Sequence, residues 1–326
     1  MSPCFVGVDL GGTNIRAAVA TSASTFANHV SERTPAQEGP DAVCDAMASA
    51  IRKAAGEAPL GGVAIGVPGP LDPQTGIVFA APHLKGWTNV PLVQMMEERL
   101  RCPVAIQNDA NLAGYGEWTA GAGKGVKTLV FITISTGVGG ALILDGKLWA
   151  GVTGTAGEIG HTPLGPNDPP CAQGHPGCLE GSASGTAIAR KGREAVASGK
   201  ETRLQDIPDE SLDAEAVEMA ARAGDAVALE IYHEAARALG RMLGGLINLI
   251  NPELIVIGGG LIQAHELIFQ PMIDAVSEMA FEVPRKGTKI VIAGLGTDAG
   301  LVGAVAWAMH EFGSVHSSVA VSSHLS

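Results

Sequence analysis

Two stretches of the chain share one pattern, in which a polar, glycine-containing turn separates two runs of apolar residues. The first is FVGVDLGGTNIRAAVAT, which begins at Phe5, and the second is TLVFITISTGVGGALIL, residues 128–144. Short apolar runs that end at glycine-containing turns are typical of β-strands. The pattern therefore predicts two hairpins, each with a wide glycine turn.

A second pair of segments reads as buried strands that end in small residues: GGVAIGVPGP at 61–70 and PELIVIGGGL at 252–261. Between the strands, helices are expected at 41–55, 213–223 and 226–250, and the later segment GLVGAVAWAMHEF also has a helical period. Alternation of strands and helices predicts an α/β protein. The paired motifs further predict two related halves, with a boundary in the glycine-rich stretch 112–126.

Composition narrows the class of protein. Of the 326 residues 46% are hydrophobic and 17% charged, which is typical of a compact globular chain. The net charge is −12 and no run of Lys or Arg occurs, so a nucleic-acid partner is not expected. No apolar run approaches the ~20 residues of a membrane span, and no signal peptide is recognisable. We therefore expect no membrane partner. The five cysteines form no disulfide pattern, so we expect a cytoplasmic protein.

The two predicted turns carry residues that suit phosphate binding. The first glycine loop, residues 9–14, contains Asp9, Gly11, Gly12, Thr13 and Asn14. Backbone N–H groups near glycine can hold an anion, and a carboxylate at a strand end can hold Mg²⁺ through water. The second glycine loop, residues 135–140, has the sequence STGVGG and includes Thr136 and Gly137. Either loop alone is compatible with an ordinary hairpin, but two matching loops favour a nucleotide site.

Polar residues after a further apolar strand are candidates for catalysis. In AIQNDANLAGYGEW, Asn108 and Asp109 follow the strand directly. A carboxylate at this place can act as a general base toward a hydroxyl group. The alternative interpretation is an aspartate that only forms a turn or caps a helix, as is common for an Asn-Asp pair.

The stretch GEIGHTPLGPNDPPCAQGHPGCLEG, residues 157–181, gathers carboxylates, imidazoles and thiols. Glu158 and His161 are three residues apart and face one pocket if the turn is helical or tight. Together with Glu180 they suit hydrogen bonds to sugar hydroxyls. Solvated loop residues are the alternative for each of them taken singly.

These motifs closely resemble the ROK family of sugar kinases and repressors over nearly all of residues 5–309. The segments that carry the likeness are VGVDLGGTNIRAAV, AIGVPGP, NDANLAGYGEW, STGVGGALI, GEIGH, CLEGSASG, LINLINPELIVIGGGL and GTDAGLVGAVAWA. The resemblance implies an α/β, two-domain actin-like ATPase (ribonuclease H-like) fold with a cleft between the domains. The implied parts are a small domain at 1–112 completed by the C-terminal helix at about 299–312, a large domain at 113–298 with a zinc-loop insertion, and a flexible tail at 313–326.

The same resemblance implies the roles of the site residues. ATP with Mg²⁺ is expected at the two glycine loops, with the adenosine near Gly258 and Gly259. Asp109 is expected to take the proton of the attacking sugar hydroxyl. The residues expected to hold the sugar are Asn108, Asp109, Glu158, His161 and Glu180.

Kinases of the family place the motif histidine on a structural Zn²⁺ beside three cysteines in CxCGxxGC. Here Gln173 replaces the middle cysteine, and His175, two residues further on, offers an imidazole. We therefore expect a zinc site with two cysteines and two histidines: His161, Cys171, His175 and Cys178. The alternative is a loop that folds without metal.

The resemblance implies an ATP-dependent hexose kinase, with glucose as the favoured substrate because of the TNIR ending of the first loop and the spacing from Cys171 to Cys178. N-acetylmannosamine or N-acetylglucosamine kinase and fructokinase are alternatives within the family, and polyphosphate is an alternative phosphoryl donor. A sugar-sensing repressor is disfavoured, because the first strand begins at about Phe5 and leaves no room for a winged helix. A homodimer or homotetramer is expected. His83 stands where the family often has an asparagine, so that sugar contact is not carried over.

Overall fold

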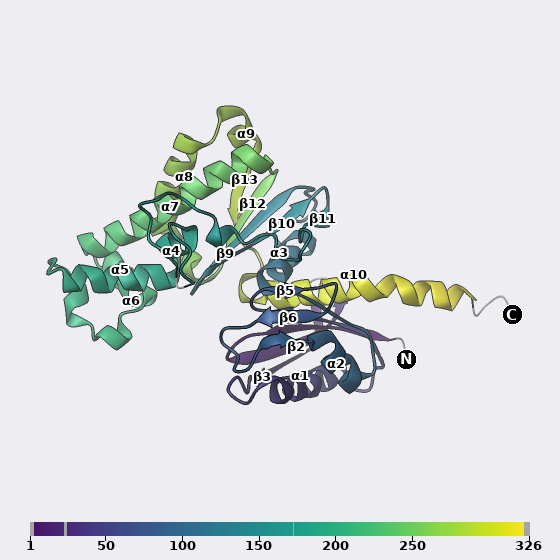
Figure 1. Ribbon diagram of the computed structural model, residues 1–326. Coiled ribbons are helices and arrows are strands. Elements are labelled where there is room, and N and C mark those ends of the chain that lie inside the picture. Colours follow the sequence, from purple (N-terminus) through teal and green to yellow (C-terminus); the bar gives the residue numbers. More distant parts are fainter. Residues whose placement is uncertain (1–2, 23–24, 172, 323–326) are drawn as a thin grey trace. The chain divides into compact units, whose positions relative to one another are not determined.

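The computed structural model describes residues 3–22, 25–171 and 173–322 (Figure 1). The chain divides into two compact units. Unit 1 comprises residues 1–127, 141–157 and 293–326, and unit 2 comprises residues 128–140 and 158–292. Residues 1–112 and 299–312, predicted to share a domain, both fall in unit 1, and the predicted domain bounds themselves stay a prediction.

Unit 1 contains a five-stranded sheet with the order β3-β2-β1-β4-β8. Its strands are β1 (Cys4–Leu10), β2 (Asn14–Ser22), β3 (Thr25–Arg33), β4 (Leu60–Val67) and β8 (Val104–Asn108). β1 pairs antiparallel with β2, which confirms the first predicted hairpin, whereas β1, β4 and β8 run parallel. The carboxyl ends of β1, β4 and β8 therefore meet at one edge of the sheet, where ligands of α/β proteins commonly bind.

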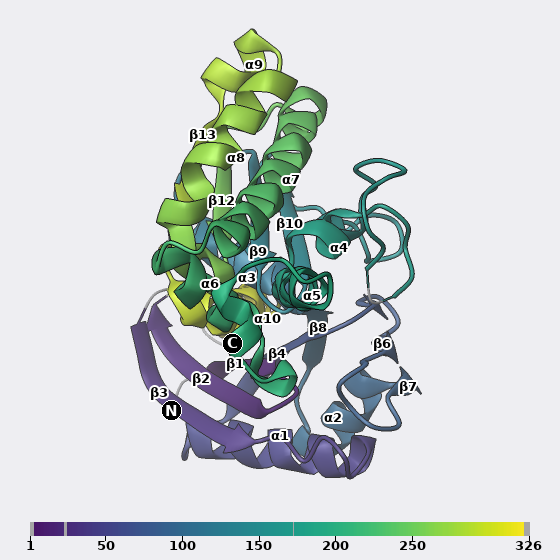
Figure 2. The ribbon, with the colours of Figure 1, turned by 90° about the vertical axis from the view of Figure 1, so that its left-hand side faces the viewer.

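The two faces of this sheet are covered by different helices because side chains alternate along β1. Val6 and Val8 join the buried core with α1 (Pro40–Ala55) and α2 (Leu92–Leu100). Gly7 points to the other face, where a Cβ atom would lie 2.3 Å from the backbone nitrogen of Val305 in α10 (Ala299–Ser322). The absent side chain thus lets α10 pack directly on the strand (Figure 2).

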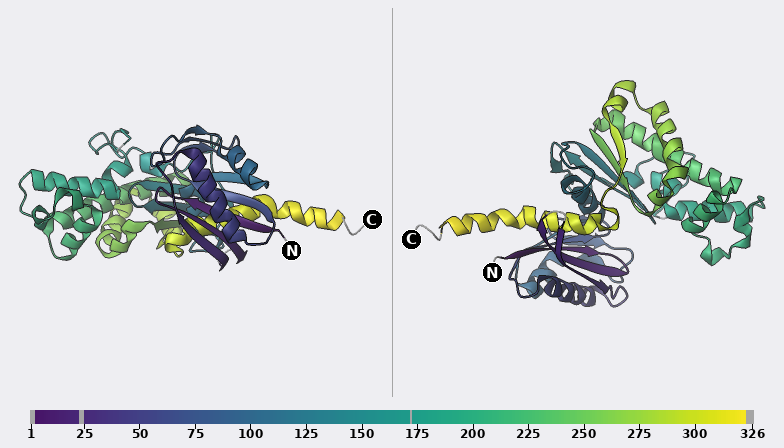
Figure 3. Two further views of the ribbon diagram at one scale, coloured as in Figure 1. Left: turned by 90° about the horizontal axis from the view of Figure 1, so that it is seen from below. Right: turned by 180° about the vertical axis from the view of Figure 1, so that it is seen from behind.

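Helix α10 begins where the closing apolar segment predicted it, and α3 (Asp109–Thr119) packs beside it (Figure 3). Helix α10 extends into the predicted tail, 313–326, as far as Ser322. Residues 323–326 lie outside the described residues. Unit 1 also holds a small sheet of β5 (Leu71–Asp72), β6 (Ile77–Ala80) and β7 (Thr88–Val90), and the short helix η5 (Gly296–Asp298).

In unit 2, β12 (Leu254–Gly258) pairs in parallel with β9 (Leu129–Ile134) and with β13 (Lys289–Ile292). The full strand order is β11-β10-β9-β12-β13, with β10 (Val138–Leu144) and β11 (Lys147–Leu148) forming a short hairpin. The boundary between the units falls within β10. The sequence segments 128–144 and 252–261 form strands as predicted.

The other helices of unit 2 are η1 (Ile159–His161), α4 (Leu179–Ala183), α5 (Gly185–Ala197), η2 (Arg203–Asp206), η3 (Asp209–Ser211), α6 (Ala214–Arg222), α7 (Ala226–Ile250), η4 (Gly260–Ala264), α8 (His265–Met279) and α9 (Glu282–Gly287). Asp225 is the N-cap of the long helix α7, and its carboxylate accepts hydrogen bonds from the backbone N–H groups of Val227 and Ala228. Burial acts to raise the pKa of Asp225, but its hydrogen bonds outweigh that effect and lower the pKa. α8 packs along α7 (Figures 1 and 2).

Among the described helices, none is both long enough and apolar enough to cross a membrane.

Candidate active site

Three of the predicted site residues lie at the carboxyl edge of the unit 1 sheet. Asp9 of β1 is in register with Gly66 of β4, and Gly66 is in register with Gln107 of β8. Asn108 and Asp109 follow Gln107 directly. The sheet therefore brings the first glycine loop and the Asn-Asp pair to the same edge, as parallel strands require.

Asn108 is the N-cap of α3, and Asp109 is the first residue of that helix. The Oδ1 atom of Asn108 accepts hydrogen bonds from the N–H groups of Ala110 at 3.0 Å and Asn111 at 3.2 Å. Its Nδ2 donates to no residue in the described part of the chain. A helix cap is therefore present at this pair, but Asn108 provides it and not the aspartate, and both residues lie at the sheet edge.

The first glycine loop is a tight turn anchored to its own hairpin. Gly11 N–H donates to the carbonyl oxygen of Asn14 at 2.9 Å, and the hydroxyl of Thr34 donates to the carbonyl oxygen of Gly11 at 2.7 Å. The N–H groups of Gly12 and Thr13 donate to no described residue. Two adjacent free N–H groups form a small anion-binding surface, as expected for a phosphate loop.

Asp9 is held by an arginine of the neighbouring strand. Arg16 donates to the Oδ2 atom of Asp9 from Nη2 at 2.6 Å and from Nε at 3.2 Å. The same guanidinium donates to the carbonyl oxygen of Thr297 at 2.7 Å and to Asp298 at 3.3 Å. The Oδ1 atom of Asp9 has no partner among the described residues, so it is the atom that can accept a water molecule bound to Mg²⁺.

His83 lies against the first glycine loop. A Cβ atom placed on Gly12 would be 3.1 Å from the Cβ atom of His83. The turn that presents this histidine is fixed by the buried side chains of Leu84 and Trp87. The residue that departs from the family pattern therefore stands at the predicted phosphate loop.

The second glycine loop is held from outside by Glu180, the second residue of α4. The Oε2 atom of Glu180 accepts a hydrogen bond from the backbone N–H of Val138 at 3.0 Å. A Cβ atom on Gly137 would lie 2.6 Å from the same oxygen, so glycine is needed for this approach. The N–H groups of Thr136 and Gly137 donate to no described residue, which repeats the arrangement in the first loop.

A cavity of about 740 Å³ adjoins the second glycine loop within unit 2. A volume of this size is typical of small-molecule sites. Its lining residues are Ser135, Thr136, Gly185, Thr186, Ala189, Arg193, Asp213, Ala214, Glu215, Glu218, Met219, Arg222, Tyr232, Gly260 and Leu261. The predicted Gly258 and Gly259 precede Gly260, and Gly259 itself packs on β9, because its Cβ would be 2.1 Å from the carbonyl oxygen of Ile134.

Glu158 and His161 face each other across the short helix η1. The Oε2 atom of Glu158 lies 4.0 Å from the Nε2 atom of His161. The other ring nitrogen, Nδ1, lies 3.8 Å from the Sγ atom of Cys171. One edge of the imidazole is therefore directed to the carboxylate and the other to a thiol.

The structure gathers three of the four predicted metal ligands. Ligand atoms of His161, Cys171 and His175 all lie within 4.8 Å of one another, and the Sγ atom of Cys171 is 3.5 Å from the Nδ1 atom of His175. A tetrahedral zinc ion with its usual bond lengths separates sulfur and nitrogen ligands by about 3.6 Å, so these three donors fit a structural zinc. Cys178 lies outside this group of three, although it is buried and its thiol contacts that of Cys171; burial raises the pKa of the Cys178 thiol. Gln173, which replaces the middle cysteine, is exposed.

The cavity contains the residues that the sequence did not identify. Thr186 and Arg193 belong to α5, and Glu215, Glu218 and Arg222 belong to α6, where they read as ordinary helix-surface residues. The one available signal was the segment SGT at the start of α5, which adjoins the second loop: Gly185 N–H donates to the carbonyl oxygen of Ser135 at 2.8 Å.

Glu117 is a further residue that the sequence did not identify, and it lies outside the cavity. Its side chain is fully buried, and it accepts hydrogen bonds from the N–H groups of Ala122, Gly294 and Leu295. It thereby joins α3 to the segment that leads into α10. Glu117 therefore has a structural role, which explains its presence in the segment NDANLAGYGEW.

A carboxylate at the carboxyl edge of a mixed sheet, two glycine loops and a nucleoside-sized cavity are features of the actin-like ATPase class of α/β proteins. The chain belongs to the ROK family, whose model matches residues 5–311. A glucokinase of Halalkalibacterium halodurans is 38% identical, over 92% of this chain and 93% of that protein.

Two solved structures are also similar to this chain. The ROK hexokinase of Thermus thermophilus has a TM-score of 0.82 at 32% identity, over 94% of this chain and 99% of that one. The ROK family glucokinase of Streptomyces griseus, in complex with glucose and AMPPNP, has a TM-score of 0.79 at 32% identity, over 94% of this chain and 99% of that one. The predicted family and the α/β, actin-like ATPase fold class are confirmed.

Proposed function

We propose that this protein is an ATP-dependent hexose kinase that transfers the γ-phosphate of ATP to the 6-hydroxyl of glucose. The observation that carries the proposal is the position of Asp109 at the same sheet edge as the first glycine loop. A base beside a phosphate loop is the arrangement that phosphoryl transfer to a hydroxyl needs. The likeness to glucokinases over nearly the whole chain supports glucose as the acceptor.

In this proposal Asp109 accepts the proton of the glucose 6-hydroxyl while the hydroxyl oxygen attacks the γ-phosphorus and ADP departs. Asn108 contributes its Nδ2 donor to the sugar. Glu158 and Glu180 accept hydrogen bonds from the other hydroxyls. His161 forms a hydrogen bond with a hydroxyl through its Nε2 atom.

The nucleotide is proposed to use the glycine loops and the cavity of unit 2. The free N–H groups of the two loops suit phosphate oxygens, and the cavity next to Ser135 suits the adenosine. Asp9 is the residue proposed to hold Mg²⁺ through water. The ion, when bound, would neutralise charge on the phosphate oxygens.

We further propose that His161, Cys171, His175 and Cys178 hold a structural Zn²⁺. The bound ion would fix the imidazole of His161 and with it the orientation of the Nε2 atom. Metal analysis of protein purified without chelator should find about one zinc per chain. A metal-free and fully active preparation would refute the site.

The free thiols of all five cysteines are in keeping with the proposed cytoplasmic location, where disulfides are rare.

The expected homodimer or homotetramer stays a prediction. A sizing experiment coupled to light scattering gives the mass of the assembly directly.

A coupled assay tests the function. With ATP, the protein should phosphorylate glucose with a higher kcat/KM than mannose, fructose, N-acetylglucosamine or N-acetylmannosamine. Better turnover of fructose or an N-acetyl sugar would overturn the choice of glucose, and no turnover of any sugar would overturn the kinase. Replacing ATP by polyphosphate in the same assay identifies the donor.

The variant Asp109→Asn tests the proposed base. The amide cannot accept the proton, so kcat should fall by about 10²- to 10⁴-fold. Glucose binding, measured by calorimetry, should be nearly retained because the amide oxygen still accepts a hydrogen bond. Turnover close to that of the wild type would remove Asp109 from this role.

A further inference from the structure

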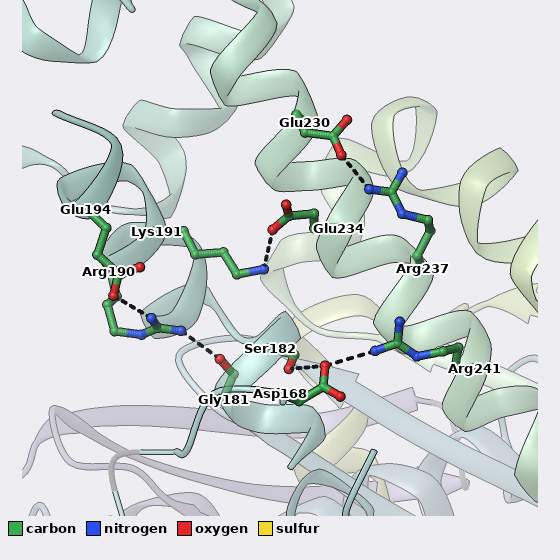
Figure 4. A network of polar contacts seen from close by, with 10 residues as sticks. All are labelled: Asp168, Gly181, Ser182, Arg190, Lys191, Glu194, Glu230, Glu234, Arg237 and Arg241. Atoms are coloured by element: carbon green, nitrogen blue, oxygen red, sulfur yellow. Dashed lines mark hydrogen bonds and ion pairs between the residues drawn. The ribbon is translucent and has the colours of Figure 1, made fainter. Parts of the chain in front are cut away.

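The metal loop, defined here as residues 162–177, has a second attachment that involves none of the proposed zinc ligands. The Oδ1 atom of Asp168 accepts a hydrogen bond from Nη2 of Arg241 on α7 at 2.9 Å (Figure 4). Ser182 of α4 donates to the same oxygen at 3.5 Å. One carboxylate of the loop therefore contacts two helices at once.

One of the two helices that Asp168 contacts, α4, also carries Glu180. Ser182 is 2% exposed and lies two residues after Glu180. The residue between them, Gly181, packs against the chain next to Asp168, because its Cβ would be 2.3 Å from the carbonyl oxygen of Pro169. Any shift of the loop at Asp168 is therefore transmitted to α4 by direct contact.

Helix α7 provides the fixed support for these contacts. It spans 25 residues, and a second ion pair, Lys191 with Glu234 at 2.8 Å, fastens α5 to it. Arg190 of α5 donates to the carbonyl oxygen of Gly181 at 3.0 Å. Figure 4 shows Arg190 directed at Gly181 of α4 and Arg241 directed at Asp168 of the loop. The helix of Glu180 is thus held from both sides.

We infer that Asp168, Arg241 and Ser182 are positioning residues, which hold the metal loop and α4 so that Glu180 keeps its place at the second glycine loop. The link is made by the Glu180 carboxylate, which accepts the N–H of Val138. The part of this inference that concerns sugar binding rests on the proposed function. The part that concerns the loop and α4 rests on the contacts alone.

The variant Asp168→Ala tests the inference. Loss of a partly exposed ion pair should raise the KM for glucose about three- to fivefold and the KM for ATP to a smaller extent, because Glu180 also holds the second glycine loop, with kcat unchanged. Hydrogen exchange should become faster in peptides that cover 162–184 and Val138. Arg237→Ala is the matched control, because Arg237 lies one turn away on α7, pairs with Glu230 and makes no hydrogen bond or ion pair with the described residues of the loop.

Two further variants keep the test decisive. Arg241→Gln removes the same ion pair from the exposed side of α7, and it should give the same changes if Asp168→Ala does not fold. The double exchange Asp168→Arg with Arg241→Asp should restore much of the wild-type KM, because the pair is re-formed with reversed charges. A general loss of stability would instead change kcat and both KM values in step, and such a result would overturn the positioning role.

Hydrogen exchange separates this inference from the proposed function. If the wild-type protein phosphorylates no sugar, the proposed function fails, yet faster exchange in the loop and at Val138 would still support the attachment. Unchanged exchange in these peptides, together with an unchanged KM for glucose, would overturn it.

Discussion

The two glycine loops have the same local geometry but are held by different parts of the molecule. In the first loop the N–H groups of Gly12 and Thr13 are free of described partners, and in the second loop those of Thr136 and Gly137 are. The first loop is held by its own hairpin, through Arg16 and Thr34. The second is held by Glu180, which lies 42 residues further along the chain.

This difference separates two ways of building a phosphate loop. In unit 1 the carboxylate of Asp9 is neutralised by an arginine seven residues away, so the loop depends on local sequence. In unit 2 a residue proposed to bind the sugar also fixes the loop proposed to bind the nucleotide. The second loop should therefore respond to changes at the sugar site, and the first should not.

Among the changes that compare the two loops, the largest effect is expected from Glu180→Ala. The variant removes a charged hydrogen-bond acceptor and leaves the N–H of Val138 without its partner, and each such loss costs about 1 to 3 kcal/mol. We expect kcat/KM for glucose to fall by about 10²-fold or more. Glu180→Gln keeps an acceptor for Val138 and should lose less. Equal losses in the two variants would show that the contact to Val138 contributes nothing.

A pair of alanine substitutions compares the loops directly. Gly137→Ala places a methyl group 2.6 Å from Oε2 of Glu180 and must displace the carboxylate, whereas the methyl group of Gly12→Ala contacts the His83 side chain, with its nearest atom at 3.1 Å. We expect Gly137→Ala to raise the KM for both ATP and glucose, and Gly12→Ala to raise mainly that for ATP. A purely nucleotide effect in both variants would contradict the coupling assigned to the second loop.

Removal of the metal should act on one loop only. Chelation of zinc would free His161, Cys171, His175 and Cys178, and the segment leading to α4 should then loosen. Faster hydrogen exchange is expected in peptides around Val138 and Glu180, with no change in residues 5–16. Mass spectrometry of exchanged peptides measures both regions in one experiment. Equal changes in the two regions would show that the metal supports the whole fold.

The smallest effect is expected from Arg16→Ala. Loss of the ion pair with Asp9, both partners being about one quarter exposed, should lower the free energy of unfolding by about 1 kcal/mol. Arg16→Lys should recover only part of it, because an ammonium group cannot reproduce the contacts of the planar guanidinium. Urea denaturation followed by circular dichroism measures the difference. A change near zero in Arg16→Ala would mean that the hairpin alone holds the first loop.

Much of the fold was predictable because its signals are local. The alternation of apolar residues with glycine turns predicted the β1–β2 hairpin, and the helical period predicted α7 and α10. The Asn-Asp pair was recognised as both a cap and a catalytic candidate, and the structure makes Asn108 the cap. The cavity of unit 2 was not predicted, since Thr186, Arg193 and Glu218 have no distinctive spacing in the sequence.

The sequence by itself determined the chemistry-bearing residues, because glycine turns, paired carboxylates and the order His161, Cys171, His175, Cys178 are local patterns with a physical meaning. Only the tertiary structure decided which of these residues support one another. The contacts of Glu180 with Val138, and of Asp168 with Arg241, join residues 42 and 73 positions apart. Such contacts depend on how α4 and α7 pack, and no periodicity along the chain encodes them.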